Sequence, residues 1–339
     1  MQHIDLPSRR RFLRQTFAFS AASMATSLAS CGRGIIGDPD GAAHLLILGD
    51  WGAISQHLDQ SSVAAAMQSY VRQQGLNLQA LLMLGDNFYG ELGSVSSSRW
   101  KTQFEDMYPR SVFNCPAYAI PGNHDYIQDE GILRYDVELQ YAKMIKTRWV
   151  MPSQFYRFTF PAFDPLVTII ALDSNVPFPD GSTQQGAFLT MTAEQRQIQL
   201  DWLTSELEKP LDTPFLVIMG HHPLYSNGPH GDNAALIRDW DPLFRQKNVH
   251  VYLAGHDHDL QHLEFEGHPT SFFCSGGGGA DLYKLVVLPE KRGPYANKAF
   301  GFSHLEVTPT LMTLRHISKD GVILHAFTKT PDNKLTILA

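Results

Sequence analysis

Residues 80–89 have the sequence Ala-Leu-Leu-Met-Leu-Gly-Asp-Asn-Phe-Tyr, an apolar run that ends in a glycine and is followed by polar side chains. A short apolar run bounded by turn residues favours a β-strand that is buried on both faces. Glycine allows the chain to turn sharply at the end of the strand, so the next polar side chains face a shared crevice. This stretch therefore predicts a buried strand that delivers Asp86 and Tyr89 to a site at its carboxyl end.

The same pattern occurs four more times along the chain. Mainly apolar runs at 44–48, 117–121, 215–219 and 249–254 each lead into a glycine and at least one polar side chain. Segments with helical character alternate with several of these runs. We expect them at 58–74, at 192–209, which opens with a capping-box-like threonine and glutamine, and at 234–246. Strand, polar loop and helix in alternation indicate an α/β fold whose ligands lie beyond the carboxyl ends of the strands.

If the five loops converge, they bring together seven side chains that are typical metal ligands. These are Asp50, Asp86, Tyr89, Asn123, His221, His256 and His258. Such a mixed nitrogen and oxygen set without sulfur suits two transition-metal ions that share one carboxylate. Two metals about 4 Å apart stabilise the attacking and leaving oxygens of a phosphoryl displacement. A phenol with a pKa of about 10 needs a strongly acidic cation to bind as phenolate, so Tyr89 points to Fe(III).

Five short motifs carry a resemblance to a known family. In chain order they are Gly-Asp-x-Gly (49–52), Gly-Asp-Asn-Phe-Tyr (85–89), Gly-Asn-His-Asp (122–125), Gly-His-x-Pro (220–223) and Gly-His-x-His (255–258). They resemble the purple acid phosphatase branch of the calcineurin-like metallophosphoesterases. The wider superfamily has a histidine where this chain has Gly52, and its absence together with Tyr89 is the purple acid phosphatase pattern. Segments between the motifs, such as 152–157 and 199–203, resemble the small, tartrate-resistant type.

The resemblance implies a fold, a ligand set and a reaction. The fold is of the α/β class, a four-layer α/β/β/α sandwich with two mixed β-sheets. Fe(III) is assigned to Asp50, Asp86, Tyr89 and His258. The second, divalent metal (Fe, Zn or Mn) is assigned to Asp86, Asn123, His221 and His256. The implied activity is hydrolysis of phosphomonoesters by a metal-bound hydroxide, without a covalent phospho-enzyme.

Two further histidines match residues that contact phosphate and protonate the leaving group in the family. They are His124 and His230, and a pKa of about 6.5 suits imidazole to acid assistance at mildly acidic pH. His222 fills a variable position of the family, and we expect it to line the wall of the site. Asp257 is expected to face away from the ligands, with orientation of a ring N–H as the alternative. Asp125 either orients His124 or caps a turn.

The first residues are predicted to be an export signal. The run Ser8 to Arg14 is rich in arginine and resembles a twin-arginine signal. A weakly apolar stretch follows and ends in Leu-Ala-Ser-Cys, which resembles a lipobox at Cys31. We therefore predict a signal peptide at 1–30, a flexible linker at 32–43 and a metallophosphoesterase domain at 44–328. The expected product is a monomeric lipoprotein, anchored in a membrane through lipidated Cys31 and facing the periplasm or the cell surface.

Composition excludes several classes of protein. The 339 residues are 43% hydrophobic and 18% charged, which is typical of a globular chain. A net charge of −7 disfavours nucleic-acid binding, which needs a basic face. Three cysteines are too few for a disulfide scaffold, although Cys115 and Cys274 could pair.

Fifteen histidines are more than the motifs use. Eight of them have no motif around them and are expected to be ordinary core or surface residues: His44, His57, His250, His262, His268, His304, His316 and His325. Two other functions stay open. One is a phosphodiesterase or nucleotidase on the same scaffold, and the other is a non-catalytic surface lipoprotein.

Overall fold

The computed structural model describes residues 41–52 and 58–338. The predicted signal peptide, Cys31, most of the predicted linker and His57 lie outside the described residues. Within the described part of the chain, none of the helices has the length and apolar character needed to cross a membrane.

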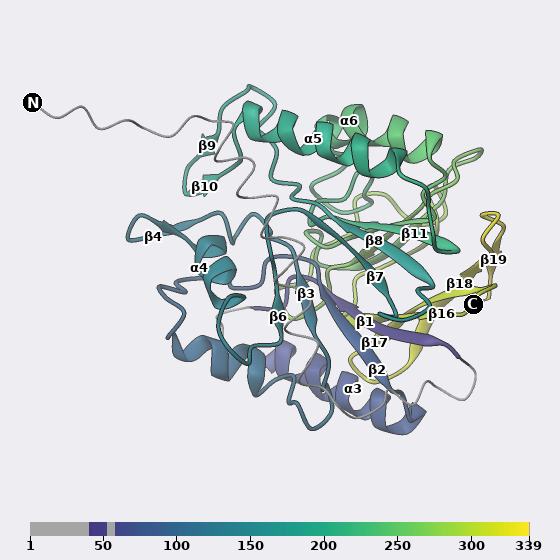
Figure 1. Cartoon of the computed structure of the whole chain (residues 1–339), viewed down its shortest axis with the longest axis horizontal. Helices are drawn as coiled ribbons and strands as arrows, with labels where there is room; N and C mark the ends of the chain where they lie inside the picture. The colour runs from purple at the N-terminus through teal and green to yellow at the C-terminus, as the bar shows by residue number, and fades with distance from the viewer. Residues whose placement is uncertain (1–40, 53–57, 339) are drawn as a thin grey trace, which may run out of the picture. The chain divides into compact units, whose positions relative to one another are not determined.

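Most of the strands build two mixed β-sheets (Figure 1). The first sheet has eight strands, in the order β19 (Leu335–Ile337), β18 (Ile323–Lys329), β17 (Met312–Ser318), β16 (Gly301–Val307), β1 (Ala43–Leu48), β2 (Leu78–Met83), β3 (Ala117–Ala119) and β6 (Trp149–Val150). Strands β1, β2, β3 and β6 run parallel, whereas β16 pairs antiparallel with β1 and continues into an antiparallel meander. Strand β19 extends this sheet beyond residue 328, the predicted end of the domain.

The second sheet has seven strands, in the order β15 (Pro294–Asn297), β13 (Leu260–Leu263), β14 (Ser271–Ser275), β12 (Val251–Ala254), β11 (Phe215–Met219), β8 (Val167–Ala171) and β7 (Tyr156–Phe160). Strands β8, β11, β12 and β14 are parallel to one another. The remaining strands form two separate antiparallel ribbons: β4 (Gln128–Asp129) with β5 (Ile132–Leu133), and β9 (Gln184–Gln185) with β10 (Phe188–Leu189).

Helices cover the outer faces of both sheets. Figure 1 shows α3 (Leu58–Gln74) on one side and α5 (Ala193–Glu208) with α6 (Ala234–Gln246) on the other. Helix α4 (Arg134–Tyr141) and a six-residue π-helix (Trp100–Glu105) lie in the connections between β2 and β6. The four-layer α/β/β/α sandwich with two mixed sheets is confirmed.

The apolar runs are buried on both faces because each strand packs between two layers. In β1, Leu45 and Ile47 belong to the core between the sheets, whereas Leu46 and Leu48 pack in the cluster that includes Val63 of α3. Strand β11 is fully buried in the same way. Each such side chain contributes roughly 1.5–3 kcal/mol relative to an exposed one. The runs at 80–84 and 215–219 therefore have no polar alternation, as expected for strands covered on both sides.

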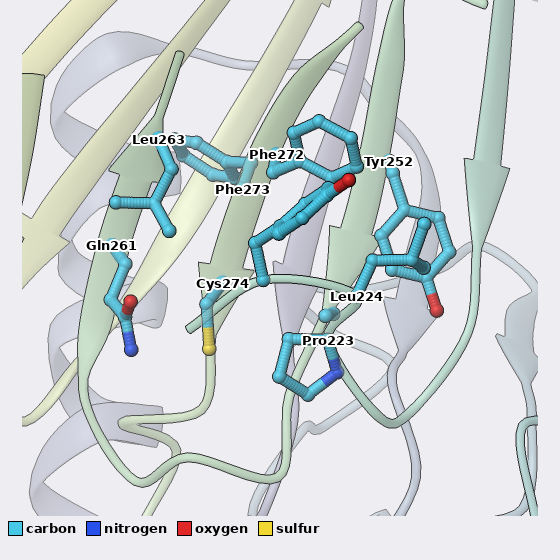
Figure 2. A pocket seen from close by; sticks show the side chains of 10 residues that line it. Pro223, Leu224, Tyr252, Gln261, Leu263, Phe272, Phe273 and Cys274 are labelled. Carbon is cyan, nitrogen blue, oxygen red and sulfur yellow. The ribbon is translucent and has the colours of Figure 1, made fainter. Parts of the chain in front are cut away.

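A hollow beneath the second sheet has no relation to the predicted ligands. Figure 2 shows that it is lined mainly by apolar side chains of β12, β13 and β14 and by Pro223 and Leu224. Cys274 lies in its wall as a buried free thiol, and Cys115 is also buried and free. The two cysteines therefore do not form the disulfide that their number allowed. We interpret the hollow as a packing feature of the core.

Candidate metal centre

The loops after five parallel strands meet at one edge of the sandwich. Asp50 follows β1, Asp86 and Tyr89 follow β2, and Asn123 follows β3. His221 follows β11, while His256 and His258 follow β12. The structure brings all seven predicted ligands together. Backbone φ is positive at three of them, with values of 58° at Asp50, 49° at Asp86 and 69° at His256. Such conformations are costly for residues other than glycine and concentrate at functional sites.

One group of ligand atoms surrounds the phenol of Tyr89. Its hydroxyl oxygen lies 3.2 Å from Asp50 Oδ1, 3.0 Å from Asp86 Oδ2 and 3.0 Å from His258 Nε2. His258 Nε2 is in turn 3.5 Å from Asp50 Oδ1. These are the four residues that the resemblance assigns to iron.

A second group surrounds the side-chain oxygen of Asn123. Asn123 Oδ1 lies 3.1 Å from His221 Nε2 and 2.9 Å from His256 Nδ1. His221 Nε2 is 3.4 Å from Asp86 Oδ1. Asp86 thus presents one oxygen to each group, which is the position of a bridging carboxylate.

The hydrogen bonds behind the rings show that lone pairs face lone pairs. His221 Nδ1 lies 2.9 Å from the carbonyl oxygen of Leu84, and His258 Nδ1 lies 2.6 Å from that of Asp281. A carbonyl oxygen only accepts, so both Nδ1 atoms donate and both Nε2 atoms of the neutral rings are acceptors. His221 Nε2 therefore points an electron pair at Asn123 Oδ1, which is also an acceptor. Either a proton on Nε2, which the raised pKa of His221 favours, or a metal ion in its place resolves the conflict. Metal sites commonly fix the outer ring nitrogen through the protein in this way.

The charges lead to the same conclusion. The Asp50 and Asp86 carboxylates are buried, and among the described residues neither forms an ion pair with a lysine or arginine. Burial alone would lower the pKa of His258, but the hydrogen bond and charge of Asp50 outweigh it and raise the pKa to about 9. Burial would also lower the pKa of His221, but the charges around it, led by that of Asp86, outweigh burial and raise the pKa. The site thus attracts positive charge at the positions where metal ions would bind, and the donor set fits two of them.

The phenol of Tyr89 needs a cation to ionise. Burial, followed by the charges of Asp86 and Asp50, raises the pKa of Tyr89 well above 10. Without a metal the hydroxyl keeps its proton and donates it to a carboxylate. Only a strong Lewis acid at this position would convert it to phenolate.

Gly52 leaves no room for a ligand side chain at the end of the first loop. A Cβ atom at this position would lie 1.9 Å from the carbonyl oxygen of Asn87, so no side chain fits. The carbonyl oxygen of Gly52 accepts a hydrogen bond from the backbone of Tyr89 at 3.0 Å. Arg99 fixes the same loop by donating to the carbonyl oxygens of Tyr89, at 2.5 Å, and Gly90, at 2.7 Å. Sequence reasoning did not single out Arg99, because a lone arginine after a polar loop carries no motif.

The two predicted acid histidines border the ligand groups. His124 donates its backbone N–H to Asp86 Oδ1 at 2.9 Å, and its ring lies 4.3 Å from that of Tyr89. Burial lowers the pKa of His124. His230 borders the second group, where its ring lies 4.1 Å from that of His256 and its side chain is 43% exposed.

Two aspartates next to the ligands have definite partners. Asp257 is fully buried and, as expected, its carboxylate is turned away from the seven ligands, with Oδ1 2.6 Å from His230 Nδ1. The alternative also holds, because this contact orients the ring of His230. Asp125 accepts hydrogen bonds from the backbone N–H groups of Asn87, Phe88 and Gly122. It therefore ties two loops together as a cap, and no hydrogen bond of the described residues joins it to the ring of His124.

Two aromatic residues beside the site had no motif to indicate them. Phe188 of β10 packs edge-on against His124, with ring centroids 5.2 Å apart. Tyr283 stacks on His258 at 4.1 Å and 11° between the ring planes. The ribbon of β9 and β10 thus reaches the site through Phe188.

Comparisons with known proteins agree with the geometry. A family model described as calcineurin-like phosphoesterase matches residues 43–260. Tartrate-resistant acid phosphatase type 5 of Oryctolagus cuniculus is 32% identical over 293 residues, which cover 81% of this chain and 86% of the relative. Purple acid phosphatase 4 of Arabidopsis thaliana is 28% identical over 301 residues, which cover 85% of this chain and 84% of the relative.

Two solved structures share the fold at lower identity. GAP50, the anchor in the inner membrane complex of Plasmodium, has a TM-score of 0.70 at 20% identity, covering 88% of this chain and 90% of that one. The purple acid phosphatase PPD1 from yellow lupin has a TM-score of 0.63 at 16% identity, covering 86% and 55%. At these identities the likeness concerns the fold alone.

Proposed function

The chain belongs to the calcineurin-like phosphoesterase family, and from this premise we propose that it is an acid phosphatase of the purple type. In this proposal it hydrolyses phosphomonoesters at a centre of one Fe(III) and one divalent ion, which is Fe, Zn or Mn. The observation that carries the proposal is the phenol of Tyr89, held within 3.2 Å of two buried carboxylates and a histidine. Relatives named purple or tartrate-resistant acid phosphatases support it.

The two atom groups described above would hold the two ions. The iron position would use Asp50, Asp86, Tyr89 and His258. The divalent position would use Asp86, Asn123, His221 and His256. When bound, such a pair of ions lowers the pKa of water and stabilises charge on the attacking and leaving oxygens of a phosphate ester.

The chain's own residues then position the ester and move a proton. His124 and His230 stand on two sides of the ligand groups, where they can contact the oxygens of a bound phosphate. The hydrogen bond between His230 Nδ1 and Asp257 leaves the other ring nitrogen free to donate a proton to the leaving oxygen. Asp257 acts as a positioning residue, because it fixes the orientation of that ring.

An assay with paired substrates tests the reaction class. Purified holoprotein should hydrolyse an aryl phosphate with a kcat/KM at least tenfold above that for the matching bis-aryl phosphate, with an optimum at acidic to neutral pH. The reverse order would favour a phosphodiesterase or nucleotidase on the same scaffold. No hydrolysis of either ester after loading with iron and zinc would favour a non-catalytic protein.

The non-catalytic alternative rests on one observation. GAP50 is described as an anchor and has a similar fold, so the fold by itself does not imply catalysis. A copy that lost its activity would be expected to lose ligands, whereas this chain retains a metal-ligating residue type at each of the seven positions. We therefore favour the enzyme.

We further propose that the enzyme is exported and held at a membrane by lipidated Cys31. The arginine-rich run from Ser8 to Arg14 and the Leu-Ala-Ser-Cys motif support this location. In cells fed a labelled fatty acid, the chain should carry label, and Cys31→Ala should remove it. Label that persists in the variant would contradict the anchor without affecting the proposed reaction.

A further inference from the structure

A third imidazole lies beside the two that the divalent position would use. The ring of His222 lies 4.9 Å from that of His221, at 83° between the planes, and 4.3 Å from that of His256, at 50°. One nitrogen atom from each of the three rings lies within 4.8 Å of the other two. No other part of the described chain gathers three histidine nitrogens in this way.

His222 is held in place from behind by a buried serine. Ser174 Oγ accepts a hydrogen bond from the backbone N–H of His222 at 2.8 Å and lies 2.8 Å from Nδ1 of the same ring. The hydroxyl of Tyr252 donates to the carbonyl oxygen of His222 at 2.7 Å. Ser174 and Tyr252 are both buried, so the backbone and the ring of His222 are fixed together.

This support matches that of a metal-ligating histidine. The hydroxyl oxygen of Ser174 has two lone pairs, and the backbone N–H of His222 uses one of them. When Nδ1–H donates to the second, Nε2 keeps a free electron pair. Histidine ligands commonly donate one ring N–H to the protein and bind the metal with the other nitrogen.

We propose that His222 is a third imidazole ligand of the divalent ion, in addition to His221 and His256. This inference rests on the proposed dinuclear centre. It also assigns a chemical preference to the divalent position. Three imidazoles favour ions such as Zn²⁺ or Fe²⁺, whereas Mn²⁺ favours a site richer in oxygen ligands.

The test uses the iron-loaded full chain and measures metal binding rather than turnover. Zn²⁺ and Mn²⁺ are titrated against a competing chelator, and X-ray absorption at the zinc edge counts nitrogen neighbours. We expect His222→Phe to lose one nitrogen neighbour and to lose more Zn²⁺ affinity than the about 10–100-fold that removal of a ligand's hydrogen-bond partner typically costs. Its Mn²⁺ affinity should fall less than tenfold, so the ratio of the two affinities drops.

Two variants make the result specific. In Ser174→Ala the ring of His222 remains but loses its hydrogen bond to Ser174, so we expect a smaller drop in Zn²⁺ affinity than in His222→Phe. This variant tests the proposal if His222→Phe fails to fold. His230→Phe is the matched control. The wild-type ring of His230 also lies next to His256, but its Nδ1 is directed at Asp257. It should leave the nitrogen count at zinc unchanged.

The outcomes separate the two proposals. Suppose that His222→Phe binds two metals per chain and has the same nitrogen count at zinc and the same ratio of affinities as the wild type. This result would overturn only the role of His222 and would leave the dinuclear centre intact. The same holds if Ser174→Ala binds Zn²⁺ as tightly as the wild type when His222→Phe does not fold. Failure of the wild-type chain to bind a second metal would overturn the dinuclear centre itself.

Discussion

The histidines at the edge of the sandwich and those in its core are equally buried in several cases, yet their surroundings differ. In the core, each nitrogen of His250 meets a complementary partner: Nδ1 accepts from the Leu216 backbone at 3.1 Å, and Nε2 lies 3.1 Å from the Pro331 carbonyl oxygen. At the edge, His221 donates from Nδ1 to a carbonyl, but its Nε2 faces only acceptors.

This difference separates a structural histidine from a ligand. Core rings such as His268 and His316 also have hydrogen-bond partners at both nitrogens. A ring with complementary partners is complete without an added ion. A ring whose Nε2 faces only a carboxylate or an amide oxygen needs a proton or a metal ion at that nitrogen. Burial by itself does not distinguish the two.

The largest effect is expected in a paired experiment, in which one ligand histidine and one core histidine are each replaced by asparagine. His221→Asn removes a ligand next to the shared carboxylate, so we expect metal loss and a fall in kcat/KM of about 10³-fold or more, which is about 4 kcal/mol. Steady-state kinetics and metal analysis measure both.

His250→Asn is the matched control for this experiment. It should keep its metal content and stay within about threefold of the wild-type kcat/KM, because His250 contacts only core groups. Equal losses of activity in the two variants would contradict the distinction between ligand and structural rings.

The next effect concerns the acid at the rim. His230→Asn should lower kcat by about 10²-fold at the pH optimum, as expected for the loss of a proton donor. Asp257→Asn should lower it by about tenfold, because Asp257 acts through His230. The double variant should then be no slower than His230→Asn. Multiplied losses in the double variant would show that Asp257 acts independently of the ring.

Tyr89→Phe is expected to lower activity less than the preceding variants of the site but to abolish the colour of the iron-loaded protein. The phenolate should give an iron-loaded protein a visible charge-transfer band, and the variant should lack it. Since the other ligands of that position remain, kcat/KM should fall less than tenfold. A visible spectrum that survives the substitution would remove Tyr89 from the iron position.

Replacement of the core histidine His250 is expected to change activity least. Its effect should instead appear in the free energy of unfolding. Burial lowers the pKa of His250 to about 4, from an ordinary value of 6.5. Its contribution to stability is therefore complete above pH 6.5 and is lost as the pH falls towards 4. Protonation would also set two donors, Nδ1 and the Leu216 N–H, against each other.

Denaturant unfolding at pH 7 and pH 4.5 measures this contribution. The difference in unfolding free energy between wild type and His250→Asn should narrow by about 2–3 kcal/mol at the lower pH. A difference that does not change with pH would mean that His250 is not a neutral core residue.

Much of the site-bearing half of the fold could be predicted because its signals are local. The apolar run at 215–219 is the strand β11, and the helices expected at 58–74 and 234–246 have those bounds. The expected capping box at Thr192 and Gln195 is present at the start of α5. Each of these features depends on residues within a few positions of one another.

Convergence of the loops and the sandwich were expected from the resemblance, but individual contacts between distant residues could not be predicted from local patterns. The sequence around Asp257 does not indicate that the chain from Ser226 to His230 folds back onto its carboxylate. Pairing of β16 with β1 joins segments some 260 residues apart, and no local pattern encodes that choice. The closeness of Gly52 to Asn87 likewise arises only when two loops meet.

Anomalous diffraction from crystals of the iron-loaded protein tests the central claim most directly. We predict two metal peaks about 3.5–4 Å apart, with iron among Asp50, Asp86, Tyr89 and His258 and the second ion beside Asn123 and His221. Crystals without metal peaks, in which the Asn123 amide turns its NH₂ group towards the two rings, would contradict it. The facing lone pairs would then be resolved by hydrogen bonds, and the site would need no cation.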